Sequence, residues 1–436
     1  MSINGTSKRF FRWVFRRDAE NVFRGMAVLA SGSVAAKMIG LATLPLITRL
    51  YTPADFGLMA VFAALLHIIT PLITLRYILA IPLPRRDGMA MNLFALSALL
   101  IVWIGSTMAL FMWAFATPLL SLIGMPELAV WWWLIVLGCV GGASYELLTY
   151  WAIRRRAYRI IAHTGVTQRF WASLVKISLG AASFGAVGLL IGQVVSMSGG
   201  VIGITRAMWE EFTQSWRQVR LRRIAQVAAR YASFPIYRVP SQFLMAFAKQ
   251  LPLIGFAYLY EPAVAGALSL AMTTLILPIS LIGTAMGKAL YAEASNLRLS
   301  DRSKIYNMTK EVQVRLFLLA VGPAILLNLF GPQLFSLVFG NEWELAGQFA
   351  SLLAIATVFQ FTSAPIIQLM NIFSNQSIFL TINICRASLV GSLFYISEFM
   401  MFKSEELIFY YALMMSFFYL FVTLYVMFVI RRGSFE

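Results

Sequence analysis

Long apolar stretches recur along the whole of this 436-residue chain, of which 60% is hydrophobic and only 12% charged. A helix needs about 20 apolar residues to cross the hydrocarbon core of a membrane, so each stretch predicts one transmembrane helix. The twelve predicted spans lie at 24–48, 57–82, 89–116, 128–153, 160–183, 186–209, 232–259, 263–292, 312–330, 345–373, 378–401 and 407–430. The chain is therefore expected to be an all-α, polytopic membrane protein.

The net charge of +17 is distributed unevenly between the loops that join these spans. Nearly all basic loop residues fall at the two chain ends and in every second loop, whereas only Arg49 and Lys403 fall in the remaining loops. Cytoplasmic loops of membrane proteins carry an excess of lysine and arginine. Both termini are therefore predicted to be cytoplasmic. This sidedness accounts for the basic charge, so nucleic acid is not an expected partner.

A short motif occurs at equivalent places in the two halves of the chain. Leu-Tyr-x-Pro-Ala-x-x-Gly spans 50–57 and 259–266, and each copy follows Leu-Pro-Leu-Ile after a short gap. Both copies join the first and second helices of a six-helix unit, which predicts two six-helix bundles related by a parallel repeat. The predicted domains are a basic cytoplasmic tail, the first bundle, an amphipathic cytoplasmic linker, the second bundle and a second cytoplasmic tail, at 1–23, 24–209, 210–231, 232–430 and 431–436.

Basic residues also lie inside the predicted spans, where few acids accompany them. They are Lys37, Arg76, Arg169, Lys176, Arg238, Lys249, Lys288 and Arg386. A charge at the bilayer centre costs about 2.5–3.5 kcal/mol on insertion scales, so the deeper ones are expected to face a polar interior. A cationic interior suits an anionic passenger, and all eight are candidate substrate-binding residues. The alternatives are buried ion pairs and, near helix ends, snorkelling to the membrane surface.

Two further titratable residues lie within the spans. Glu146 is a candidate for ion coupling, or the acid of a structural ion pair, and His67 either titrates near neutral pH or packs as a hydrogen-bonded core residue. Cys139 and Cys385 fall in apolar segments and are expected to be packing residues. No nucleotide-binding motif, metal cluster or catalytic triad is visible. We therefore expect no catalytic residues, no metal, no cofactor and no enzymatic activity.

Two short patterns carry a resemblance to a known family. Thr-Arg-Leu-Tyr-x-Pro-x-Asp-Phe-Gly at 48–57 and Phe-Gly-Asn-Glu-Trp-x-x-Ala at 339–346 resemble the lipid-linked oligosaccharide, or O-antigen, flippases. These belong to the multidrug/oligosaccharidyl-lipid/polysaccharide exporter superfamily. The resemblance implies two six-helix bundles that form a V around a central cavity, opening to each side in turn. In the related peptidoglycan-precursor flippases, cations on the first, second, seventh and eighth helices hold a pyrophosphate, which implies such a role for residues on those helices here.

The resemblance and the cationic spans together predict a flippase of a bacterial inner membrane. It would move an undecaprenyl-pyrophosphate-linked oligosaccharide from the cytoplasmic to the periplasmic leaflet, for synthesis of O-antigen, capsule or exopolysaccharide. The expected partners are this substrate, membrane lipids, and a polysaccharide polymerase with its chain-length proteins. The alternatives are an ion-coupled multidrug extruder of the same fold and a membrane glycan polymerase or ligase. Cation extruders generally need membrane-embedded acids, and polymerases usually need a long outer loop; both features are scarce in this sequence.

Overall fold

A computed structural model describes residues 17–297, 302–373 and 376–432, and over these ranges the chain is helical, without strands. The first half contains α2 (Arg17–Leu50), α3 (Pro53–Ile73), α4 (Asp87–Ser121), α5 (Trp132–Arg154), α6 (Tyr158–Ala181), α7 (Ala186–Ser198) and α8 (Val201–Ala207). The linker contains α9 (Trp209–Trp216) and α10 (Leu221–Arg230). The second half contains α11 (Val239–Leu259), α12 (Pro262–Pro278), α13 (Thr284–Asn296), α14 (Arg302–Phe339), α15 (Glu344–Phe373), α16 (Gln376–Met400) and α17 (Ser404–Arg432).

The prediction of an all-α, multi-pass membrane protein is confirmed. Within the described ranges, nine helical segments are long and apolar enough to cross a membrane. The predicted spans 160–183, 232–259 and 378–401 are not among these nine, although each coincides with a long helix, α6, α11 and α16. These three helices carry several of the predicted cavity cations, which lower their hydropathy. Of the predicted tails, residues 1–16 and 433–436 lie outside the described ranges.

Several predicted spans differ from the observed helices because of backbone breaks. Span 57–82 ends early, at Ile73, because Leu75 and Arg76 adopt left-handed conformations with φ of 45° and 58°. Span 263–292 is divided into α12 and α13 by Pro278 and a π-turn, η4 (Ile279–Gly283). Span 186–209 is likewise divided into α7 and α8, and span 312–330 is part of the longer α14.

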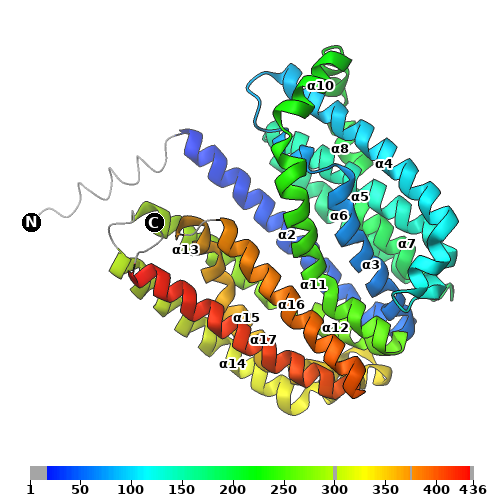
Figure 1. Cartoon of the computed structure of the whole chain (residues 1–436), viewed down its shortest axis with the longest axis vertical. Coiled ribbons are helices and arrows are strands. Elements are labelled where there is room, and N and C mark those ends of the chain that lie inside the picture. The colour runs from blue at the N-terminus through cyan, green and yellow to red at the C-terminus, as the bar shows by residue number, and fades with distance from the viewer. Residues whose placement is uncertain (1–16, 298–301, 374–375, 433–436) are drawn as a thin grey trace, which may run out of the picture.

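The helices form two lobes (Figure 1). In the first lobe α2 packs along α6, and α5 packs against α4 and α7; in the second, α15 packs between α14 and α17. The lobes meet where α3 of the first half packs against α11 and α12 of the second. From this junction they diverge toward the N-terminal end of α2 and the C-terminal end of α17 (Figure 1). We name the junction the closed side and the opposite side the open side.

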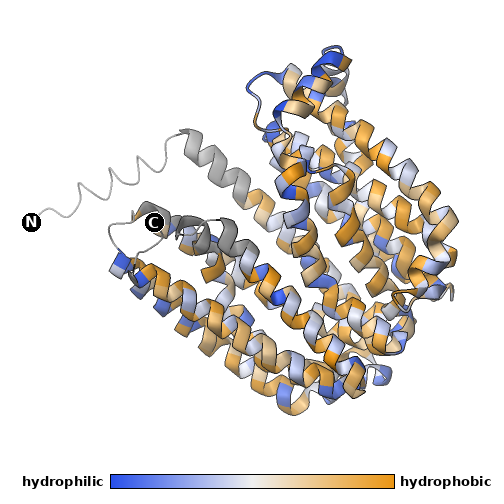
Figure 2. Cartoon of the chain, viewed as in Figure 1, coloured by the Kyte–Doolittle hydropathy of each residue, from blue (hydrophilic) through white to orange (hydrophobic). Residues whose placement is uncertain are grey.

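Polar residues gather at the open end of the first lobe, around α10, whereas apolar residues run along the helices of both lobes (Figure 2). Arg154 at the end of α5 forms an ion pair with Asp87 at 2.7 Å, and Arg155 forms pairs with Asp87 and with Glu211 of α9. The buried side chain of Asn92 on α4 also binds the linker, accepting a hydrogen bond from the main-chain N–H of Arg220 at 3.0 Å. The linker is thus fixed to the first lobe.

Candidate substrate cavity

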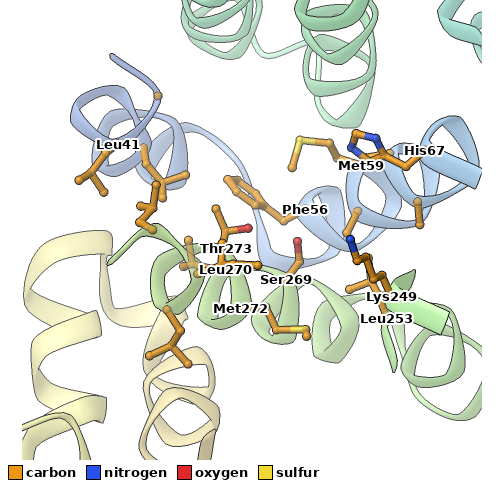
Figure 3. Close-up of a pocket in the computed structure, with 18 of the residues that line it drawn as sticks. Leu41, Phe56, Met59, His67, Lys249, Leu253, Ser269, Leu270, Met272 and Thr273 are labelled. Atoms are coloured by element: carbon orange, nitrogen blue, oxygen red, sulfur yellow. The ribbon is translucent and has the colours of Figure 1, made fainter. Parts of the chain in front are cut away.

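A cavity of about 730 Å³ lies between the two lobes. Its walls come from α2, α3, α6 and α7 of the first half and from α11, α12, α15, α16 and α17 of the second. Figure 3 shows Met59 and His67 of α3 and Lys249 of α11 among the side chains that line it. The cavity is therefore built at the interface that any movement of one lobe against the other must change.

Basic side chains from both halves line this cavity. The structure brings together five of the eight predicted cations, namely Lys37, Arg169, Lys176, Lys249 and Arg386, and adds His67. No aspartate or glutamate is found among the described residues that line it. A site with excess positive charge in a low-dielectric surrounding attracts anions strongly and disfavours cations.

In the first half, the wall of the cavity is centred on α6. Arg169 and Lys176 both line the cavity, as their seven-residue spacing on one helix face predicts. Lys176 Nζ donates a hydrogen bond to Gln193 Oε1 of α7 at 3.3 Å and lies 3.6 Å from the sulfur of Met59. These neutral partners hold the ammonium group in place without neutralising its charge.

In the second half, the wall joins three helices. Lys249 of α11 and Arg386 of α16 line the cavity together with Tyr411 and Tyr419 of α17. Tyr411 lies within hydrogen-bonding reach of Arg386. Sequence reasoning missed the two tyrosines, because an uncharged polar residue in an apolar helix gives no signal of which face it occupies. With Met415 between them, which also lines the cavity, Tyr411 and Tyr419 follow the i, i+4, i+8 pattern of a broad helix face.

The other three predicted cations do not line the cavity. The buried Arg76 forms an ion pair at 2.9 Å with the partly buried Glu146 of α5 and donates a second hydrogen bond to Gln242 of α11 at 3.3 Å. Glu146 therefore has a structural partner. Arg238 and Lys288 are exposed, and snorkelling of these two residues stays a prediction.

The two resemblance motifs meet on the closed side of the cavity. The indole N–H of Trp343 donates a hydrogen bond to the main-chain carbonyl of Thr48 at 2.9 Å. The ring of Trp343 also packs edge-on against Phe56, with centroids 4.7 Å apart, and both side chains are almost completely buried. Phe56 lines the cavity, so this contact between the halves closes the cavity on that side.

The repeated glycines allow α3 and α12 to touch. A Cβ atom at Gly57 would lie 2.7 Å from the carbonyl carbon of Pro262, and one at Gly266 would lie 2.9 Å from that of Pro53. Each proline is the first residue of its helix, a position that proline favours. The repeat therefore encodes a reciprocal crossing of the first turns of α3 and α12, which only glycine permits at that separation.

The repeated tyrosines fix each copy of the motif within its own half. The Tyr51 hydroxyl donates to the main-chain carbonyl of Lys176 on α6 at 2.7 Å, and the Tyr260 hydroxyl donates to that of Phe402 after α16 at 2.8 Å. Burial, with a smaller effect of Asp55, raises the pKa of Tyr51 to about 12, and burial also raises the pKa of Tyr260. Both phenols therefore remain protonated donors at physiological pH. In each half the motif binds the fifth predicted helix or the loop after it.

Comparisons with known proteins agree with this architecture. The chain is similar in structure to a mutant of the Vibrio cholerae MATE transporter VcmN, with a TM-score of 0.56 and 13% identity over 94% of this chain and 97% of that one. It is also similar to an inward-facing multidrug resistance MATE transporter of the MOP superfamily (TM-score 0.55, 16% identity, 93% and 96% covered) and to the eukaryotic MATE transporter AtDTX14 (0.54, 13%, 93% and 96%). At these identities the likeness establishes the fold.

The sequence itself matches a family. No curated protein matches the chain. Residues 46–347 match the family described as polysaccharide biosynthesis protein, a range that includes both resemblance motifs and most of the helices that line the cavity. The chain therefore belongs to the polysaccharide biosynthesis protein family and has the fold of the MATE transporters.

Proposed function

We propose that this protein is a flippase for an anionic, lipid-linked oligosaccharide. The observation that carries the proposal is the cavity between the lobes, which is lined by five basic side chains and, among the described residues, by no acidic one. A pyrophosphate group supplies the complementary charge, and the polar side chains of the cavity, including Gln193, Tyr411 and Tyr419, provide hydrogen-bond partners for sugar hydroxyls. Membership of a polysaccharide biosynthesis family supports a glycan substrate.

The proposed route follows from the shape of the molecule. The substrate enters from the open side, which we assign to the cytoplasm because the basic linker helix α10 lies at the open end of the first lobe (Figure 1). Rocking of the lobes then opens the closed side, at the contact between Phe56 and Trp343, toward the periplasm. The membrane concerned is a bacterial inner membrane, and both chain termini face the cytoplasm.

A multidrug extruder of the same fold is the second candidate, supported by the fold likeness to multidrug MATE transporters. The lining of the cavity argues against a cationic drug, because binding one there places it among like charges, and no carboxylate among the described lining residues offsets them. A glycan polymerase or ligase is the third candidate. Each of these predicts a different product in the experiment below.

The test uses a strain whose surface polysaccharide depends on this protein. Deletion is expected to accumulate lipid-linked oligosaccharide on the cytoplasmic leaflet; accumulation on the periplasmic leaflet would instead indicate a polymerase or ligase. Complementation with Lys176→Ala or Lys249→Ala is expected to lower export at least about tenfold per inserted protein, since a hydrogen bond to a charged group is worth about 1.5–3 kcal/mol.

The matched control is Arg315→Ala. This exposed arginine pairs with Glu311 one turn away on α14, and surface pairs of that kind contribute little. Normal export is expected. Normal export from both cavity variants at matched abundance would overturn the proposal, as would drug sensitivity without a polysaccharide defect in the deletion strain.

A further inference from the structure

Lys37 differs from the other lysine of the first-half wall in the partner of its ammonium group. Lys176 donates to Gln193, within its own half of the chain. Lys37 Nζ on α2 instead donates to the main-chain carbonyl of Ser280 at 3.2 Å, which belongs to the π-turn η4 in the second half. A cavity cation is therefore bonded directly to the backbone of the opposite half.

The π-turn makes this carbonyl available. In an α-helix, the N–H of Thr284 would bind the carbonyl of Ser280, four residues earlier. Here the Thr284 N–H binds the carbonyl of Ile279 instead, because the turn contains one extra residue. The Ser280 carbonyl accepts from Lys37 and from the hydroxyl of Thr284 at 2.6 Å. If Lys37 leaves, the Thr284 hydroxyl still satisfies this carbonyl.

The bond joins two elements that otherwise pack on different neighbours. The main packing partner of α2 is α6, with a smaller contact to α14, whereas η4 packs on α12, α13 and α15. Met38, next to Lys37 on α2, is 49% exposed, and Ile282 of η4 is 40% exposed, so both positions are accessible to labels.

We propose that the hydrogen bond from Lys37 to Ser280 is a latch between the two halves, which an anionic phosphate group in the cavity releases. This inference rests on the proposed function. A phosphate oxygen carries formal negative charge, whereas the Ser280 carbonyl oxygen is only a dipole, so the phosphate attracts the Lys37 ammonium group more strongly, neutralises its charge and displaces the carbonyl. The exchange detaches α2 from η4. The binding energy of the substrate therefore favours the conformation in which the lobes are free to move.

The experiment measures the width of the seam in the full-length protein reconstituted in lipid nanodiscs. Spin labels are placed at Met38→Cys and Ile282→Cys, after Cys139 and Cys385 have been replaced by alanine. Inorganic pyrophosphate is the probe, and sulfate at equal ionic strength is the control. Pyrophosphate is expected to lengthen the label-to-label distance by about 1–2 Å or more, the usual size of helix shifts at interfaces. Titration calorimetry on the same sample measures binding of the probe.

Two matched variants make the result specific. Lys37→Met removes the latch. The longer label-to-label distance is therefore expected already without pyrophosphate, and adding pyrophosphate is expected to change it no further. Lys176→Met removes a cavity cation that bonds within its own half, so the short distance is expected without pyrophosphate. Two results would overturn the latch and leave the proposed function intact. One is pyrophosphate binding without a longer label-to-label distance; the other is a short label-to-label distance in Lys37→Met. Absence of pyrophosphate binding overturns both.

Discussion

The crossing of α3 and α12 predicts that a single methyl group changes which side of the cavity is open. In Gly57→Ala the new Cβ would lie 2.7 Å from the carbonyl carbon of Pro262, whereas ordinary contact begins at 3.4 Å. The two first turns must therefore separate by at least the 0.7 Å difference between these distances. The obstacle is main chain rather than a flexible side chain, so it cannot rotate away.

The energetic effect differs between the two states of the transporter. Alanine stabilises a helix relative to glycine by about 0.5–1 kcal/mol, but this gain applies equally whether or not α3 and α12 touch. The steric cost, about 1–3 kcal/mol for overpacking, applies only while they touch. Gly57→Ala is therefore expected to shift the equilibrium toward opening of the closed side by about 5- to 150-fold.

Cysteine labelling measures this shift. Thr273 lines the cavity, so Thr273→Cys is placed in a background without Cys139 and Cys385, and a membrane-impermeant maleimide is added outside intact spheroplasts. Gly57→Ala is expected to increase the labelling rate at least about fivefold. Gly322→Ala on α14 is the control, because a Cβ there meets no atom within 4 Å. Equal labelling rates in the two variants would refute the reasoning.

Three further predictions concern other parts of the chain. Glu146→Ala leaves the buried Arg76 without its ion-pair partner and is expected to destabilise the protein by about 3–5 kcal/mol. The double variant Arg76→Met with Glu146→Leu removes both charges and is expected to restore most of the melting temperature. An unchanged melting temperature in Glu146→Ala contradicts the ion pair. Tyr51→Phe removes the second donor to the Lys176 carbonyl of α6 and is expected to cost about 0.5–1.5 kcal/mol in thermal unfolding; an unchanged melting temperature contradicts a stabilising role for this bond. Reporter fusions after Arg156 and Lys403 are expected to report cytoplasm and periplasm, and opposite signals at both would reverse the topology.

Much of the architecture follows from local sequence properties. A run of apolar residues in lipid has to be helical, because no water is present to bind free main-chain groups, so the spans were predictable from hydropathy. Charges and prolines within spans limited the accuracy of that prediction. The left-handed residues Leu75 and Arg76 and the π-turn after Pro278 interrupt two spans that hydropathy alone draws as continuous.

The sequence by itself determined that cations lie within the membrane, that Arg169 and Lys176 share one face, and that the two halves carry the same motif. Only the tertiary structure decided that Lys176 lines the cavity while Arg76 is bound to Glu146, and that the two copies of the motif touch at Gly57 and Gly266. The physical reason is that helical periodicity fixes which residues share a face. The surroundings of that face depend on helices that are distant in the chain. Those helices decide whether a cation on the face has an acidic partner or lies in a cavity.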